Sequence, residues 1–250
     1  MIEAVNVTKC FGENKVLDQI SVKFETGKCN LVIGQSGSGK TVLMKCLVGL
    51  FEIDKGKVMF DEKVLSRMSF EEMKLVRQDI GMLFQGGALF DSMPVEENVM
   101  FPLSMFTDQS LSERRDRANF CLSRVNLKDA NKLYPSEISG GMKKRVAIAR
   151  AIAMNPRYLF CDEPNSGLDP KTANVIDNLI KEITEEYDMT TVINTHDMNS
   201  VVEIGDNVFY IHNGKLWWQG DKESILNSDN KELNEFVFAT ELTKKIKSAL

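Results

Sequence analysis

The chain has 250 residues and a formal net charge of -5 at pH 7, with 43% hydrophobic and 27% charged residues. This length is enough to bury a sizeable core, and the composition is ordinary for a globular protein. The acidic balance argues against a broad surface for nucleic acid, so no nucleic acid partner is expected.

Two strands and a glycine-rich loop open the chain. Residues 2–8 and 16–24 alternate apolar and polar side chains, and residues 12–14 between them predict a turn. The short apolar run 31–33 meets the glycine-rich loop, and residues 41–50 predict a helix. A strand, a loop and a helix in this order are the setting that a phosphate-binding loop requires.

The loop GQSGSGKT, residues 34–41, fits the phosphate-binding pattern GxxxxGK[ST]. Its glycines let backbone N–H groups crowd around phosphate oxygens, and the helix N-terminus adds positive partial charge. Lys40 can reach the β- and γ-phosphates, and the Thr41 hydroxyl can bind Mg²⁺. We therefore predict ATP and Mg²⁺ as cofactors, whereas the alternative is a glycine turn that caps an ordinary helix. The predicted nucleotide-binding residues of the loop are Gly34, Ser36, Gly37, Ser38, Gly39, Lys40 and Thr41.

The middle of the chain, about residues 86–155, predicts helices rather than strands. A capping box at Ser110 and Glu113 precedes one of these helices. We interpret the stretch as a helical subdomain inserted into an α/β core. Buried parallel strands with helices between them are predicted around it. Their apolar runs are 80–84, 157–161 and 190–193.

The strand after the helical stretch runs into two acids, Asp162 and Glu163. At the carboxyl edge of a strand, Asp162 can hold Mg²⁺ directly or through a water. Glu163 is the predicted catalytic residue that polarises a water for attack on the γ-phosphate. A solvated acidic turn is the alternative, but the phosphate loop upstream favours the catalytic interpretation.

The end of the chain predicts a hairpin and a helical tail. Asn213-Gly214, between FYIH and KLWWQ, is a two-residue hairpin signal. We predict an ATPase domain over residues 1–228 and a helical tail over residues 229–250. The tail either packs on its own domain or holds a second ATPase subunit or a small accessory cytosolic subunit. Its apolar residues at helical spacing are Leu233, Phe236, Val237 and Thr240, with Phe238 beside them.

The stretch SGGMKKRVAIARAIAMNPRYLFCDEPNSGLDP, residues 139–170, closely resembles the region of ABC ATPases that runs from the signature to the Walker B strand and the D-loop. The resemblance covers roughly residues 1–225, and further motifs occur in the family's order. It implies a P-loop NTPase (RecA-like) α/β core with an N-terminal antiparallel β subdomain and an inserted helical subdomain. It also implies a head-to-tail homodimer, in which the signature of each chain closes the ATP site of the other.

The resemblance implies roles for residues outside the phosphate loop. Gln85 would contact Mg²⁺ or the attacking water, and His196 would hydrogen-bond the γ-phosphate, so both join Glu163 as predicted catalytic residues. Phe11 would stack on adenine. The alternatives are a strand-end glutamine, a structural histidine and a core phenylalanine. The signature and the D-loop add Ser139, Gly140, Gly141 and Asp169 to the predicted nucleotide-binding residues.

The signature also has a physical interpretation of its own. Ser139 is placed to cap a helix, and the N–H groups near Gly140 and Gly141 can form an anion site. The basic residues 143–145 (KKR) in the first turn oppose the helix dipole unless negative charge is near. A bound triphosphate would supply that charge. A capped helix with a solvated basic face is the alternative.

Two features narrow the resemblance. Ile138 and Met142 replace the leucine and glutamine that are usual in the signature. Met142 and the segment MLFQGGALFDSMPVEENVMFPL (82–103) look most like ATPases of the Mla-type, Mce-associated phospholipid transporters of bacterial envelopes. This likeness implies a lipid cargo, a transmembrane permease partner and a peripheral position on the cytoplasmic face of the inner membrane. The methionines and phenylalanines over 82–106 exceed what a small helical lobe must bury, so we expect some of them to form an apolar groove for a helix of the membrane subunit.

Segments that would place the chain in or across a membrane are not expected. No stretch approaches the roughly 18 consecutive apolar residues of a spanning helix. The start MIEAVNVTKCFG has neither the charged nor the apolar region of a signal peptide. The five cysteines form no CxxC pair, which favours reduced thiols in the cytoplasm.

Two other functions compete with transport. Non-transport ABC ATPases act on chromosomes, DNA repair or ribosomes, but those relatives carry long coiled coils or a second ATPase domain, and this chain predicts neither. A simple nucleotide-binding kinase would not need the signature or the D-loop. We therefore expect the ATPase subunit of a membrane transporter.

Overall fold

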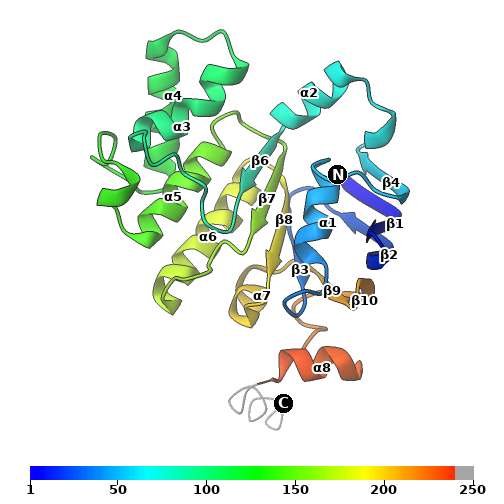
Figure 1. Ribbon diagram of the computed structural model, residues 1–250. Helices are drawn as coiled ribbons and strands as arrows, with labels where there is room; N and C mark the ends of the chain where they lie inside the picture. Colours follow the sequence, from blue (N-terminus) through cyan, green and yellow to red (C-terminus); the bar gives the residue numbers. More distant parts are fainter. Residues whose placement is uncertain (240–250) are drawn as a thin grey trace.

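The computed structural model describes residues 1–239, which form two sheets and the helices packed on them (Figure 1). The strands are β1 Ile2–Phe11, β2 Asn14–Phe24, β3 Lys28–Ile33, β4 Lys55–Phe60, β5 Lys63–Val64, β6 Ile80–Leu83, β7 Tyr158–Asp162, β8 Thr190–Thr195, β9 Asn207–His212 and β10 Lys215–Gly220. The α-helices are α1 Lys40–Leu47, α2 Phe70–Gln78, α3 Val95–Phe106, α4 Leu111–Arg124, α5 Gly140–Ala151, α6 Pro170–Glu186, α7 Met198–Ile204 and α8 Lys231–Val237. Two 3₁₀ turns span Leu65–Arg67 and Pro135–Glu137.

The larger sheet has the strand order β10-β9-β3-β8-β7-β6, and its strands are parallel except for β10. The smaller sheet has the order β2-β1-β4-β5 and is antiparallel. Strand β10 joins β9 through Asn213 and Gly214, whose φ angles of 48° and 72° suit a tight hairpin turn. The predicted hairpin is therefore confirmed, and the two-sheet arrangement agrees with the predicted fold class.

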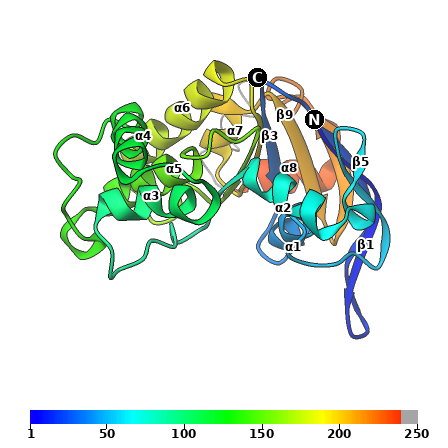
Figure 2. The ribbon, with the colours of Figure 1, turned by 90° about the horizontal axis from the view of Figure 1, so that it is seen from above.

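The parallel sheet separates two apolar clusters, because successive side chains of a strand point to opposite faces. Leu31 and Cys161 lie in the cluster that includes α5 and α6. Val32 and Phe160 lie in the cluster that includes α1 and the antiparallel sheet. Figures 1 and 2 show this layering, with α5 and α6 on one side of the parallel strands and α1 on the other. Both faces of the central strands are thus covered, which leaves their carboxyl edge for a site.

Helices α3, α4 and α5 lie between β6 and β7 in the chain, where helices were predicted. The capping box at Ser110 and Glu113 is formed at the start of α4 as expected. The sequence prediction missed β4, β5 and α2, which occupy the span from 55 to 78. Helix α2 begins with a capping box at Ser69 and Glu72, a signal of the same kind as that at Ser110, although it buries little besides Val76.

The described part of the C-terminal tail packs on its own domain. Leu233 and Val237 of α8 are buried in the cluster that includes α5 and α6. The Phe236 ring stacks on Tyr210 of β9 with centroids 5.4 Å apart. Thr240, the remaining position of the predicted apolar stripe, lies outside the described residues, and the boundary at 228 stays a prediction. Among the described residues, no helix combines the length and the apolar character needed to cross a membrane.

Candidate active site

The phosphate loop lies between β3 and α1, and two of its glycines are required by their surroundings. Gly34 has a φ of 150°, and a Cβ there would come within 2.3 Å of the Ile211 carbonyl oxygen. Gly39 has a φ of 108° and directly precedes α1, with the Val16 carbonyl oxygen 3.1 Å from a Cβ placed on it. The loop can therefore bend tightly at the helix N-terminus, which is the geometry that presents N–H groups to an anion.

Lys40 is buried at the centre of this loop. Its Nζ donates hydrogen bonds to the carbonyl oxygens of Gly34, at 2.7 Å, and of Gln35, at 3.0 Å. Burial lowers the pKa of the ammonium group, while the nearby carboxylates of Glu163 and Asp162 oppose that shift. The ammonium group of Lys40 is thus held against the start of the phosphate loop, near the carboxylates of Asp162 and Glu163.

Thr41 and Asp162, both predicted to bind Mg²⁺, lie together. The Thr41 hydroxyl donates to Oδ1 of Asp162 at 3.3 Å, and Asn194 Nδ2 donates to the same oxygen at 3.0 Å. Asn194 is a buried residue of β8 that the sequence analysis missed. A polar side chain near the carboxyl end of a buried strand, two positions before His196, was the available signal. Its hydrogen bond fixes the orientation of the carboxylate.

These oxygen atoms fit a magnesium ion that ATP brings with it. Among residues 1–239, no cluster of three or more His, Cys, Asp or Glu side chains is placed to hold a metal alone. Mg²⁺ prefers oxygen ligands, keeps several waters, and is commonly held by one or two protein groups together with substrate phosphates. A threonine hydroxyl beside an aspartate, at the mouth of a phosphate loop, is a donor set of that kind.

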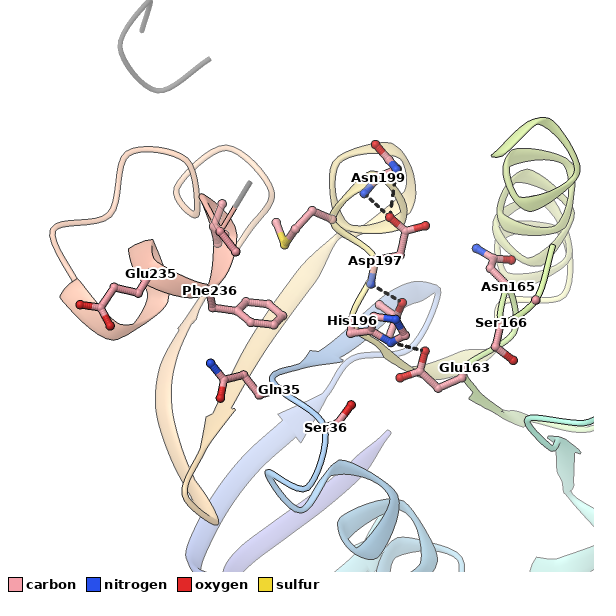
Figure 3. A pocket seen from close by; sticks show the side chains of 15 residues that line it. Gln35, Ser36, Glu163, Asn165, Ser166, His196, Asp197, Asn199, Glu235 and Phe236 are labelled. Atoms are coloured by element: carbon pink, nitrogen blue, oxygen red, sulfur yellow. Dashed lines mark hydrogen bonds and ion pairs between the residues drawn. The ribbon is translucent and has the colours of Figure 1, made fainter. Parts of the chain in front are cut away.

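Glu163 and His196 form a second pair at the same edge of the sheet (Figure 3). His196 Nδ1 lies 2.8 Å from Oε2 of Glu163. Glu163 has a φ of 51°, in the left-handed region that few non-glycine residues adopt, and its N–H donates to the Asn194 carbonyl oxygen at 2.9 Å. Such backbone strain concentrates at functional sites. Here the strained residue is Glu163 itself, whose carboxylate contacts His196.

Two pockets adjoin these pairs. A pocket of about 280 Å³ is lined by the phosphate loop together with Val16, Gln85 and Glu163. A larger pocket of about 720 Å³ is lined by Gln35, Ser36, Glu163 and His196 and, from α8, by Phe236. Figure 3 shows the Phe236 side chain facing His196 across this second pocket. Glu163 therefore borders both spaces.

Gln85 is exposed, but its backbone is firmly held. Its carbonyl oxygen accepts hydrogen bonds from Lys144 Nζ and, at 3.4 Å, from the Ser166 hydroxyl. Lys144 is buried, and Arg145 donates to the carbonyl oxygens of Val125 and Asn126. The interpretation of residues 143–145 as a solvated basic face is therefore wrong for Lys144, because folding turns its side chain toward backbone carbonyls.

The signature lies apart from the phosphate loop of its own chain. Ser139 Oγ accepts the N–H of Met142 at 3.2 Å and so caps α5 as predicted. None of the signature residues Ser139, Gly140 and Gly141 lines either of the two pockets described above. Asp169, in the D-loop, caps α6 by accepting the N–H of Thr172 at 3.1 Å. Direct roles of these residues at a nucleotide stay predictions.

Phe11 ends β1 on an exposed surface. Its side chain is 46% exposed and meets the edge of Phe51 with centroids 5.5 Å apart, while Lys9 Nζ lies 5.2 Å from the ring centroid. This exposure shows that the ring is not part of the core. Phe11 is also absent from the residues that line the two pockets beside the phosphate loop. Stacking on adenine stays a prediction.

A phosphate loop at the head of a helix, with a threonine–aspartate pair and a glutamate–histidine pair at the carboxyl edge of a parallel sheet, defines a P-loop nucleotide hydrolase. Residues 17–166 match the family model described as ABC transporter. The chain therefore belongs to the ABC transporter ATP-binding family, the ATPases that drive transport.

Curated relatives agree on the family and differ in the cargo that they name. The probable ribonucleotide transport ATP-binding protein mkl of Mycobacterium leprae is 36% identical over 94% of this chain and 68% of its own length. The methionine import ATP-binding protein MetN of Campylobacter jejuni is 35% identical over 95% of this chain and 75% of its own. The intermembrane phospholipid transport system ATP-binding protein MlaF of Haemophilus influenzae is 36% identical, covering 95% and 90%. The chain spans about two thirds of the length of the mycobacterial relatives.

Solved structures extend the match to the fold and to a dimer. A dimeric ATP-binding cassette in a post-hydrolysis state, bound to ADP and Pi, superposes with a TM-score of 0.80 at 32% identity, covering 89% of this chain and 99% of the other. The protein cbiO1 of Clostridium perfringens, part of an ABC transporter complex, superposes with a TM-score of 0.84 at 27% identity, covering 99% and 97%. The predicted α/β class of P-loop ATPase is confirmed.

Proposed function

We propose that the two residue pairs at the sheet edge divide the chemistry of ATP hydrolysis between them. Lys40 and the loop bind the phosphates, and Thr41 and Asp162 hold Mg²⁺. Glu163 activates the attacking water, and His196 hydrogen-bonds the γ-phosphate. The observation that carries the proposal is the meeting of both pairs around one buried lysine. Mg²⁺, when bound with ATP, would neutralise charge on the phosphates.

The complete site is proposed to need two chains. The signature of this chain borders neither pocket at its own phosphate loop, yet Ser139 caps α5 and Gly140 beside it is exposed. A head-to-tail homodimer would bring that helix end to the γ-phosphate bound by the other chain. The dimeric state of the similar cassette bound to ADP and Pi supports a site shared between two chains.

An apolar groove is proposed to receive the permease. The groove, about 410 Å³, includes Met82, Phe84, Phe90, Phe101 and Phe106 in its lining. Phe84 and Phe90 are each 39% exposed and Phe106 is 47% exposed, whereas Met100 and Leu103 are buried. Part of the methionine and phenylalanine excess is therefore core, and the rest forms a surface that a helix of the membrane subunit would cover. Through it the chain would lie on the cytoplasmic face of the inner membrane.

Phospholipid or another envelope lipid is the cargo that we propose. The segment 82–103 and Met142 carry the likeness to the Mla-type ATPases, and the Haemophilus relative is named for phospholipid transport.

A tag on this chain should retrieve the permease, and any small accessory cytosolic subunit, from detergent-solubilised membranes. The complex purified in detergent without lipid should then hydrolyse ATP faster when phospholipid is added than when methionine or a ribonucleotide is added. Stimulation by either of those solutes and not by lipid would contradict the lipid assignment. The same complex carrying Glu163→Gln is the control for contaminating ATPases.

A further inference from the structure

Lys144 is a buried cation in a place where an apolar side chain would be expected. It lies in the second turn of α5, the signature helix, with 6% of its surface exposed. Burial lowers the pKa of its ammonium group, so the charged form is costly there. A buried charge of this kind needs specific partners to offset its desolvation.

The partners of Lys144 are the backbones of two proposed catalytic residues. Its Nζ donates to the carbonyl oxygen of Gln85 and, at 3.4 Å, to that of Glu163. The Gln85 carbonyl also accepts the hydroxyl of Ser166, in the loop after Glu163. The loop after β6, the turn after β7 and the signature helix therefore meet at one ammonium group.

A second cation of α5 extends the same connection. Arg150 donates to the carbonyl oxygens of Gly87 at 2.6 Å and of Ala88 at 2.7 Å. Both acceptor residues have positive φ angles, 77° and 46°, so the backbone of this loop is bent where the helix holds it. Within the described residues, the segment from Gln85 to Ala88 is thus tied to α5 through three carbonyl groups.

We propose that Lys144 is a positioning residue for hydrolysis: it fixes the loop that carries Gln85 and the turn that carries Glu163 to the signature helix, so that the three move together. The inference rests on the catalytic roles predicted for Gln85 and proposed for Glu163. A methionine at this position would fill a similar volume but remove the ammonium donor from both carbonyls. Among the described residues, only Ser166 would still donate to them, through its hydroxyl to Gln85 and through its N–H to Glu163. The backbone that carries the Gln85 side chain would then be held less firmly at the edge of the phosphate-loop pocket.

A matched control lies in the same helical lobe. Arg117 of α4 donates to the carbonyl oxygens of Ile152, at 3.0 Å, and of Ala153, at 2.9 Å, just beyond the other end of α5. Like Lys144, Arg117 is a cation that donates to two backbone carbonyls. Its acceptors, however, follow the C-terminal end of α5, whereas those of Lys144 belong to Gln85 and Glu163. Arg117→Met should lower the melting temperature and leave the turnover number, kcat, near that of the wild type.

The test is a double-mutant cycle on the full-length chain, with kcat and KM for ATP and the melting temperature measured for each protein. Lys144→Met should lower kcat about tenfold, the size expected when a hydrogen bond to a charged group is lost, and should change KM little. On a Gln85→Ala background part of that loss should disappear, because one of the two side chains that Lys144 positions is already gone, whereas the contact with Glu163 remains. Lys144→Gln, which keeps an N–H donor, should retain more activity than Lys144→Met.

Each alternative outcome has a distinct meaning. Wild-type kcat in Lys144→Met, or the same tenfold loss on both backgrounds, would overturn the inference. Equal rates for the methionine and glutamine variants would also overturn it, since the hydrogen bonds would then carry no effect. Wild-type kcat in Gln85→Ala alone would refute the proposed role of Gln85, and the inference would fall with it. Should Lys144→Met not fold, Lys144→Gln replaces it in the cycle, with a smaller loss expected and the same dependence on Gln85.

Discussion

Glu163 and His196 meet because β7 and β8 are in register, with Asp162 opposite Asn194. The residue after β7 and the residue after β8 therefore emerge beside each other, and Nδ1 of the histidine lies 2.8 Å from Oε2 of the glutamate. The Glu163 φ of 51° turns the backbone sharply directly after the end of β7. Parallel strands whose carboxyl ends share one edge can bring distant sequence positions together in this way.

Replacing Glu163 tests its role as the catalytic base. Glu163→Gln should lower kcat at least about 100-fold, because an amide cannot accept the proton of the attacking water. ATP affinity should stay near the wild-type value, since Lys40 and the loop remain in place, and the closed dimer should accumulate in size-exclusion chromatography with ATP. Glu71→Gln, an exposed change on α2, is the control. Near-normal turnover by Glu163→Gln would remove this residue from the catalytic role.

Replacing Ser139 tests whether the site is shared between two chains. Ser139→Arg should abolish hydrolysis while the dilute monomer still binds ATP, because the bulky side chain would strike the phosphate bound by the other chain. The cap of α5 is also lost, at a cost of about 1 kcal/mol. Ser139→Ala removes the same cap without bulk, so comparing melting temperatures separates the two effects. A collapse of nucleotide affinity in the monomer would refute the composite site.

Asp177 should make the stability of the chain depend on pH. This residue of α6 is 1% exposed, and burial raises the pKa of its carboxyl group to about 6 from an ordinary value of 3.8, with hydrogen bonds from Asn165 and Ser200 opposing the shift. The folded chain thus holds the proton more tightly than the unfolded chain. Its contribution to stability is present below pH 3.8 and is lost as the pH rises to about 6.

The matching experiment compares the wild type with Asp177→Asn in thermal melts from pH 4 to pH 8. The asparagine variant cannot ionise, so it should melt near the wild-type temperature at pH 4 and increasingly above it as the pH rises. Taking the difference between the two proteins cancels the other carboxylates, which titrate in both. A difference that stays constant over this range would show that Asp177 does not titrate as inferred.

Local motifs could be predicted from the sequence because each of them is contiguous. The phosphate loop, the capping box at Ser110 and the turn at Asn213 each depend on a few neighbouring residues, and their geometry follows from glycine and cap chemistry. The carboxyl-edge position of Asp162 followed equally from an apolar run that ends in acids.

Features that depend on distant partners could not be predicted. The burial of Lys144 is set by carbonyl groups 59 and 19 residues away, so its neighbours in the sequence suggest only a basic face. Asn194 acquires its role from an aspartate 32 residues earlier. Strand β4 forms because β1, some fifty residues upstream, offers it an antiparallel partner. The short run KGKVMF, of which only half is apolar, does not by itself indicate that pairing.

Truncation after Ser228 tests what the tail does. It removes α8, whose Leu233 and Val237 are buried, and whose Glu232 accepts the indole N–H of Trp217 at 3.2 Å. Each buried large side chain contributes roughly 1.5–3 kcal/mol, so the melting temperature of the isolated subunit should fall clearly. The control is truncation after Ala239, which keeps α8 and should keep the wild-type melting temperature. If that control loses binding to the second subunit or to other chains of the complex, the last residues hold a partner while α8 stabilises the fold. An unchanged melting temperature after the longer truncation would contradict the packing role of α8.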